Sequence, residues 1–251
     1  MKRKIIYTVM GIMMILTLGS CSQDMTRNES GREESQNVAA SDAGAGETSK
    51  PNILIAYFTW ADNTVVEDQD SALQSAIKHY ESMGDEDKYG ADAISSASIL
   101  APGNAARLAD WIQQEVGGDL FSIQTSVPYP SDYDECMDRA AEEKAENARP
   151  KLMGSIDNFE KYDVIFLGFP NWWYSLPMPV LSFIEKYDFS GKTVIPFCTH
   201  GTGGLSATVR ELEAALPDST IVEEPLSVYR AEILKAQPKV WDWLETLGYI
   251  Q

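Results

Sequence analysis

Short apolar stretches alternate with amphipathic ones from residue 52 onward, and this order restricts the fold more than any other feature. Two stretches, around 53–57 and 164–167, are continuously apolar, as expected of strands covered on both faces. The pattern predicts strands at 52–59, 119–125, 163–169, 193–199 and 219–228, and helices at 104–116, 131–149, 179–187, 205–216 and 231–247. This alternation predicts an α/β domain with a parallel sheet and right-handed crossovers, although it leaves the strand order open.

The first 21 residues have the features of an export signal. A basic segment, residues 2–4, precedes an uncharged run at 5–18, which is shorter than the roughly 20 residues needed to span a bilayer. The sequence LGSC at 18–21 resembles the lipobox of bacterial lipoproteins. The resemblance implies that residues 1–20 are removed and that Cys21 carries a lipid, which anchors the protein to a membrane of the bacterial cell envelope, facing outside the cytoplasm. A plain signal peptide or a short uncleaved anchor is the alternative.

Residues 21–50 and 51–251 differ sharply in composition. The first segment is rich in Ser, Gly and charged residues and has no aromatic residue, so it cannot bury enough apolar surface to offset its ordering entropy. We expect a flexible tether at 21–50, between the lipid and a domain at 51–251.

The chain is strongly acidic, with 38 Asp and Glu residues against 20 Lys and Arg and a formal net charge of −18. Binding of nucleic acid needs clustered basic surface, so this composition argues against a nucleic-acid partner. An acidic field would steer a basic protein partner, although acidic surfaces also simply keep proteins soluble.

Three loops of unusual composition follow predicted strands, at the edge where open α/β sheets bind their ligands. The first, residues 59–64 (TWADNT), offers hydroxyl and amide groups but no Lys or Arg. It would hold a phosphate with neutral donors and a helix N-terminus. The sequence has neither a Walker-type P-loop nor a G-x-G-x-x-G fingerprint. An ordinary polar turn is the alternative.

The second loop, residues 168–177 (GFPNWWYSLP), carries three consecutive aromatic residues. Trp172, Trp173 and Tyr174 cannot all face one core, so at least one is expected to stack on a planar ligand. A hydrophobic plug at the end of the sheet is the alternative. The third loop, residues 199–204 (THGTGG), has three glycines that would let backbone N–H groups approach a ligand, or would merely join a strand to a helix.

Taken together, these loops resemble those of flavodoxin-like proteins. The resemblance covers residues 52–226 and rests on the strand at 53–58 followed by Thr59, and on GFPNWW at 168–173, FSGKTVIPFCTHG at 189–201 and YPSDYDE at 129–135. More narrowly, the Pro-Asn-Trp-Trp loop is similar to that of one bacterial branch. The resemblance implies a flavodoxin-like three-layer sandwich, a five-stranded sheet of order 2-1-3-4-5, and flavin mononucleotide (FMN) held by the three loops.

The phosphate loop departs from the family, whose members commonly start the first helix with Gly-Asn-Thr. Residues 62–64 keep Asn and Thr, but Asp62 replaces the glycine, and its carboxylate would repel a phosphate. Residues 103–105 fit the helix start better, although Ala105 lacks the hydroxyl, a loss of about 1.5 to 3 kcal/mol for a hydrogen bond to a charged oxygen. We prefer this second alignment, which makes 61–101 an insertion with a short helix at 71–83. This insertion is acidic, and three interpretations stay open: it covers the cofactor as a lid, it is a docking surface for a partner, or it is only a solvent-exposed loop.

Carried over by position, the loop after the first strand would hold the phosphate. Residues 168–177, the aromatic loop, would lie at the edge of the isoalloxazine or stack on it, and residues 199–204, the glycine loop, would line its pyrimidine side. The cofactor residues so implied are Thr59, Trp60, Gly103, Asn104, Ala105, Pro170, Asn171, Trp172, Trp173, Tyr174, Thr199, His200, Gly201 and Gly204.

The catalytic candidate is His200, which would donate a proton or a hydrogen bond to a reduced flavin or to a substrate; packing against its own loop is the alternative. No spacing of His, Cys, Asp or Glu predicts a metal site. Cys136 falls on a predicted helix and Cys198 on a predicted strand, so we expect separate thiols.

The sequence therefore favours an FMN-binding redox protein that passes electrons to a protein partner or reduces a small acceptor such as a quinone. Whether it is an enzyme stays open. One alternative is a flavodoxin-fold binding module that has lost tight FMN affinity and recognises another ligand or protein. Another is an interaction scaffold.

Overall fold

The structure, a computed structural model, describes residues 50–83, 98–201 and 203–251. Residues 48–251 form one structural unit, and the fold described below belongs to it. The predicted signal peptide, Cys21 and nearly all of the predicted tether lie outside the described residues, as does the middle of the predicted insertion.

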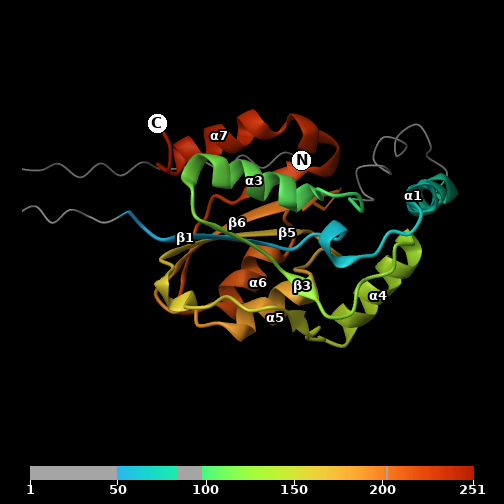
Figure 1. Ribbon diagram of the computed structural model, residues 1–251, viewed down its shortest axis with the longest axis horizontal. Coiled ribbons are helices and arrows are strands. Elements are labelled where there is room, and N and C mark those ends of the chain that lie inside the picture. The colour runs from blue at the N-terminus through green and yellow to red at the C-terminus, as the bar shows by residue number, and fades with distance from the viewer. Residues whose placement is uncertain (1–49, 84–97, 202) are drawn as a thin grey trace, which may run out of the picture. The chain divides into compact units, whose positions relative to one another are not determined.

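A parallel sheet lies at the centre of this unit (Figure 1). Its strands run in the order β2-β1-β5-β6-β7, and β8 also pairs with β6. Every pairing within it is parallel. The strands are β1 (Ile53–Tyr57), β2 (Asp119–Ser122), β5 (Val164–Pro170), β6 (Thr193–His200), β7 (Thr220–Ile221) and β8 (Leu226–Tyr229). With β7 and β8 taken together as the fifth strand the order is 2-1-3-4-5, so the predicted flavodoxin-like α/β fold is confirmed.

Two of the predicted strands are interrupted. The strand predicted at 219–228 forms β7, which pairs with the start of β6, and β8, which pairs with its end. Pro225 lies between them and has no N–H to donate to a ladder. The strand predicted at 119–125 leaves the main sheet after β2, and its end forms β3 (Gln124–Thr125), which pairs antiparallel with β4 (Leu152–Met153).

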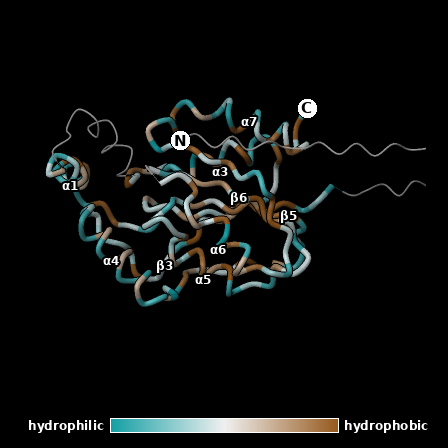
Figure 2. The backbone as a smooth tube through the Cα atoms, turned by 180° about the vertical axis from the view of Figure 1, so that it is seen from behind, coloured by the Kyte–Doolittle hydropathy of each residue, from teal (hydrophilic) through white to brown (hydrophobic). Residues whose placement is uncertain are grey.

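Helices cover both faces of the sheet, as the continuously apolar strands predict. In β1, Ile53 and Ile55 pack on one face with α3 and α7, whereas Leu54 and Ala56 belong to the core of the opposite face, with α5 and α6. Figure 1 shows α3 and α7 on one side of the sheet and α5 and α6 on the other, and Figure 2 shows hydrophobic strands in the middle. The α-helices are α1 (Gln69–Ser82), α3 (Asn104–Val116), α4 (Tyr133–Ala145), α5 (Met178–Lys186), α6 (Thr208–Ala215) and α7 (Gln237–Thr246).

Local sequence explains where several helices begin. Asp68 and Asp132 cap α1 and α4, since each carboxylate accepts hydrogen bonds from two backbone N–H groups of the first turn. The helix predicted at 231–247 is divided into a 3₁₀ segment, η3 (Arg230–Lys235), and α7. Pro238 lies in the first turn of α7, where its missing N–H costs nothing. Two shorter 3₁₀ segments are η1 (Ala61–Asn63) and η2 (Phe159–Lys161).

Within residues 50–83, 98–201 and 203–251, no helix combines the length and apolar character needed to cross a bilayer.

Candidate functional site

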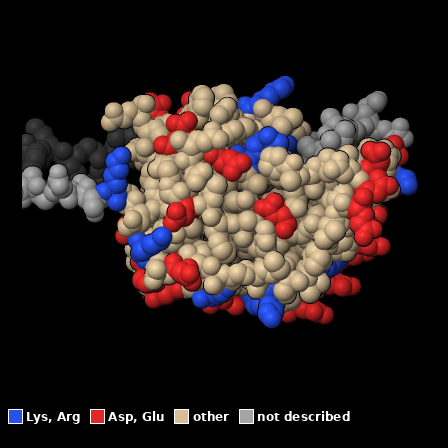
Figure 3. All heavy atoms as spheres, in the orientation of Figure 1, with Lys and Arg blue, Asp and Glu red and all other residues tan. Residues whose placement is uncertain are grey.

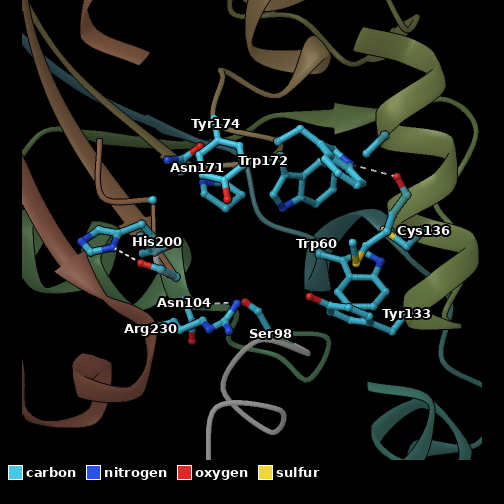
Figure 4. A pocket seen from close by; sticks show the side chains of 17 residues that line it. Trp60, Ser98, Asn104, Tyr133, Cys136, Asn171, Trp172, Tyr174, His200 and Arg230 are labelled. Carbon is cyan, nitrogen blue, oxygen red and sulfur yellow. Dashed lines mark hydrogen bonds between the residues drawn. The ribbon is translucent and has the colours of Figure 1, made fainter. Parts of the chain in front are cut away.

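A cavity of about 270 Å³ lies at the carboxyl ends of β5 and β6 (Figure 4). All three loops selected from the sequence contribute to its walls. The predicted site residues that line it are Trp60, Asn104, Pro170, Asn171, Trp172, Trp173, Tyr174, Thr199, His200 and Gly201. The other predicted residues, Thr59, Gly103, Ala105 and Gly204, are not among its lining residues.

The aromatic loop turns back on itself in a tight two-residue turn. Trp172 and Ser175 exchange backbone hydrogen bonds of 3.2 and 3.0 Å. Between them, Trp173 and Tyr174 have φ values of 51° and 62°. Two central residues at positive φ define a type I′ turn, which usually takes Asn-Gly. Left-handed backbone costs roughly 1 to 2 kcal/mol for each residue with a side chain, so this loop is strained at the wall of the cavity.

The three aromatic side chains lie in different surroundings. Trp172 is partly buried: it lines the cavity and packs edge-on against Phe58 and Tyr129 of the core, with ring centroids 5.2 and 5.3 Å away. Trp173 and Tyr174 are 41% and 61% exposed. The indole N–H of Trp173 donates to the carbonyl of Met137 on α4, 3.0 Å away. The exposed rings of Trp173 and Tyr174 therefore lie at the cavity, and the expected stacking of at least one ring on a planar ligand stays a prediction.

Asn171 joins the aromatic loop to the glycine loop. Its backbone N–H donates to the carbonyl of Thr199, 2.8 Å away, and its side-chain amide N–H donates to the carbonyl of Gly204. These bonds fix the orientation of the side chain. Its Oδ1 atom is buried and accepts no hydrogen bond from the part of the chain that the structure describes. This oxygen lies at the cavity wall and can accept a hydrogen bond from a ligand or from another part of the chain.

The chain returns after the insertion to place α3 beside the end of β1. A Cβ atom at Gly103, the N-cap of α3, would lie 2.0 Å from Oγ1 of Thr59. The backbone of Gly103 therefore touches Thr59, a position that the second alignment requires. Trp60 follows Thr59, and its indole N–H donates to the carbonyl of Pro130.

Residues 62–64, the first alignment, form a structural turn instead. Asn63 is buried, and its amide N–H groups donate to the carbonyls of Thr59 and Ile123. Its Oδ1 accepts from the backbone of Thr125. The carboxylate of Asp62 accepts from Ser122.

His200 lines the cavity at the end of β6. Its Nδ1 lies 2.6 Å from the carbonyl oxygen of Gly201, and because a carbonyl only accepts, Nδ1 carries the proton of this bond. In the neutral ring Nε2 is then an acceptor. The ring also lies 6.1 Å, centroid to centroid, from that of Tyr229. The geometry supports packing in the loop and leaves Nε2 as the group that can exchange a proton.

Comparison with known proteins identifies the family. The sequence model described as flavodoxin matches residues 93–247. The chain belongs to the flavodoxin family. Among curated proteins, none matches it in sequence.

Several solved structures resemble this flavodoxin. A proposed flavoprotein from Bacteroides uniformis is 26% identical, with a TM-score of 0.55, over 78% of this chain and 98% of the other. A proposed flavoprotein from Bacteroides eggerthii is 24% identical, with a TM-score of 0.51, over 79% and 98%. A flavoprotein in complex with FMN from Lactobacillus acidophilus is 16% identical, with a TM-score of 0.48, over 74% and 97%.

Residues of α4 that sequence reasoning missed form another wall of the flavodoxin cavity. Tyr133, Cys136, Met137 and Ala140 line it. Their spacing of three and four places them on one helix face, but the same spacing is typical of core contacts. Cys136 and Cys198 are free and buried thiols, as expected. Burial raises the pKa of both thiols, so they are protonated at neutral pH.

Three further lining residues, Ser98, Gly203 and Arg230, come from loops or strand ends. Arg230 directly follows β8, the last strand of the sheet, so the rule that located the three loops applies to it too. His79, the other histidine, pairs with Asp134 and does not line the cavity. The described parts of the chain contain no group of His, Cys, Asp or Glu side chains suited to a metal ion.

Proposed function

We propose that this flavodoxin binds FMN in the cavity at the carboxyl ends of its strands. One observation carries the proposal: three loops that are far apart in the sequence converge on one cavity, with exposed aromatic rings on one side and the N-terminus of α3 on another (Figure 4). This is where open α/β sheets bind ligands, and the family supplies the expectation of FMN.

The residues present suit such a ligand. Trp173 and Tyr174 offer faces for a planar ring system. The buried Oδ1 of Asn171 supplies an acceptor for a ring N–H. The N-terminus of α3 offers a positive helix end for a phosphate, although the backbone N–H of Asn104 itself donates to the hydroxyl of Ser98.

Residues that do not line the cavity act through others. Gly103 allows the start of α3 to touch Thr59, and Gly204 holds the amide of Asn171 through its carbonyl. Ala105 occupies the position where the family commonly has a hydroxyl, so phosphate binding must depend on other groups.

FMN supplies the redox chemistry when it is bound, by taking up and releasing electrons. The chain orients the ring, keeps water from one side of it, and offers Nε2 of His200 as a proton acceptor or donor beside Thr199 and Gly201. We assign the protein to electron transfer with a protein partner or to reduction of a small acceptor such as a quinone. Figure 3 shows acidic side chains gathered where α1 and α4 lie, and the exposed acids of α4 include Asp134, Glu135 and Asp138. This surface would attract a basic partner.

We also propose that the protein is a lipoprotein of the bacterial cell envelope, anchored through Cys21. The support is the sequence LGSC at 18–21 after a basic segment and an apolar run. Mass spectrometry of the protein expressed in a bacterium tests this, because replacement of Cys21 with Ser should abolish both lipid attachment and membrane recovery.

The visible spectrum of the purified protein tests the proposed cofactor. We expect an oxidised flavin band near roughly 450 nm, either as isolated or after incubation with FMN and removal of the excess. A protein that stays colourless with excess FMN would refute the assignment and leave the binding-module alternative. Anaerobic reduction followed by mixing with a quinone or with a basic redox protein then separates the two kinds of electron acceptor.

A further inference from the structure

The charges that face the cavity differ from those of the whole chain. The chain has 38 acidic residues against 20 Lys and Arg. Among the described lining residues, however, none is Asp or Glu, and Arg230 is the single Lys or Arg. A lining that excludes carboxylates and includes one guanidinium, in a protein this acidic, suits a ligand with an anionic group.

Arg230 lies close to the start of α3. It follows β8 and opens η3, and η3 packs against α3. Figure 4 shows its side chain beside Asn104 and Ser98, on the opposite side of the cavity from Trp172 and Tyr174. Asn104 and Ser98 are joined by a hydrogen bond of 3.0 Å from the backbone N–H of Asn104 to the hydroxyl of Ser98.

Two contacts hold the guanidinium in this place. A Cβ atom at Gly201 would lie 2.8 Å from Nη1 of Arg230, so the guanidinium lies against the backbone of the loop after β6. Its central carbon also lies 5.2 Å from the ring centroid of Tyr80 on α1. A side chain at Gly201 would therefore displace the guanidinium from this position.

The two segments aligned with the family's phosphate loop, residues 59–64 and 103–105, offer few strong partners for a phosphate. Residues 59–64 contain no Lys or Arg, and the third residue of the helix start, Ala105, has no hydroxyl. An arginine compensates well for such losses, because its planar guanidinium donates two parallel hydrogen bonds to phosphate oxygens and stays charged at all relevant pH values.

We propose that Arg230 binds the phosphate of the flavin together with the N-terminus of α3, and so makes the chain select phosphorylated flavin over riboflavin. This inference rests on the proposed FMN function. It assigns Arg230 to ligand specificity: the aromatic side of the cavity recognises the ring, and Arg230 recognises the phosphate at the opposite side.

Paired titrations with FMN and riboflavin test the proposal, since the two ligands share the ring and differ by the phosphate. In Arg230→Met, which keeps an apolar side chain over Tyr80, the dissociation constant for FMN should rise by about 10- to 100-fold. The constant for riboflavin should stay within about twofold. Arg230→Lys should recover part of the FMN affinity, because lysine keeps the charge but not the fork.

Arg107→Met is the matched control. Arg107 lies on α3, is similarly half-buried and does not line the cavity, so its loss removes the same charge without the contact. It should change FMN affinity by less than about threefold. Equal loss of FMN and riboflavin affinity in Arg230→Met, or no loss of either, would overturn the inference. If that variant does not fold by circular dichroism, the same comparison in Arg230→Lys decides. A wild-type protein that binds neither flavin would refute the proposed function instead.

Discussion

Replacement of Gly103 with alanine should destabilise the ligand-free protein through one steric contact. The backbone of Gly103 has φ −66° and ψ 167°, which any residue adopts, so no backbone strain is introduced. The added Cβ would instead lie 2.0 Å from Oγ1 of Thr59 and 3.1 Å from Cβ of Ala61. Thr59 is buried, and its β-branched side chain has few rotamers with which to move away. Overpacking of this kind costs about 1 to 3 kcal/mol of unfolding free energy.

A double-mutant cycle separates this contact from general damage. Thr59→Ala removes Oγ1, so Thr59→Ala/Gly103→Ala should be more stable than the sum of the single effects predicts, by about 1 kcal/mol or more. Thr59→Val is the matched control, because it keeps a branched side chain of the same size and should give no relief.

Urea unfolding, followed by circular dichroism and tryptophan fluorescence, measures each variant, and an unchanged m-value shows that two-state behaviour is retained. Two results would show that α3 does not start against the end of β1. One is an unfolding free energy of Gly103→Ala within about 0.5 kcal/mol of wild type, which is the usual scatter for surface substitutions. The other is strict additivity of the two substitutions in the double-mutant cycle. The experiment needs no flavin and so tests the predicted phosphate loop independently of its ligand.

Three further predictions concern the cavity. Trp173→Ala should weaken FMN binding by about tenfold or more, because it removes a ring face, whereas Trp241→Ala, an equally exposed tryptophan on α7 away from the cavity, should leave the titration unchanged. Tyr174→Gly should raise the unfolding free energy of the ligand-free protein by about 1 kcal/mol, since glycine adopts positive φ without strain, while it weakens FMN binding; a loss of stability in urea would contradict this. Burial raises the pKa of the Cys136 thiol, so its reaction with a thiol reagent should be slow at pH 7. At pH 9 the reaction rate should still rise about tenfold for each pH unit, whereas the rate of an ordinary thiol levels off. Cys136→Ala gives the background rate. Bound FMN should slow the reaction further.

Much of the fold could be predicted because its central elements have strong local patterns. β1 and β5 are continuously apolar, and α3 begins and ends as predicted, with Gly103 and Gly117 at its two ends. The strand predicted at 219–228 and the helix predicted at 231–247 were wrong in detail. Both are divided in the structure, and hydrophobic pattern alone does not reveal where a strand loses its partner or a helix tightens to 3₁₀.

The candidate site was predicted as far as it depends on strand ends. The rule that ligands bind beyond the carboxyl ends of strands located the loops that begin with Thr59, Gly168 and Thr199. Arg230, which directly follows the fifth strand, falls under the same rule, but only the loops of unusual composition were predicted to hold the ligand. The wall formed by Cys136 and its neighbours on α4 could not be predicted, because a helix face that lines a cavity has the same spacing as one that packs in a core.

The strained turn and the charge of the cavity lining are independent observations that both indicate a ligand-binding site. A type I′ turn is most stable with Asn-Gly, but this chain has Trp173 and Tyr174 there. Their left-handed backbone costs roughly 2 to 4 kcal/mol over the two residues, and the turn places two aromatic side chains at the cavity. Among the described residues that line the cavity there is no carboxylate, although Asp and Glu outnumber Lys and Arg by 38 to 20 in the chain, and Arg230 is present. Neither choice helps folding, since a relaxed turn and an additional solvated carboxylate would both be tolerated at a surface loop. Departures from local rules concentrate at functional sites, where binding energy offsets their cost. Both departures here fall on the walls of one cavity, on opposite sides of it, and they match the two parts of a flavin nucleotide, a planar ring and an anion.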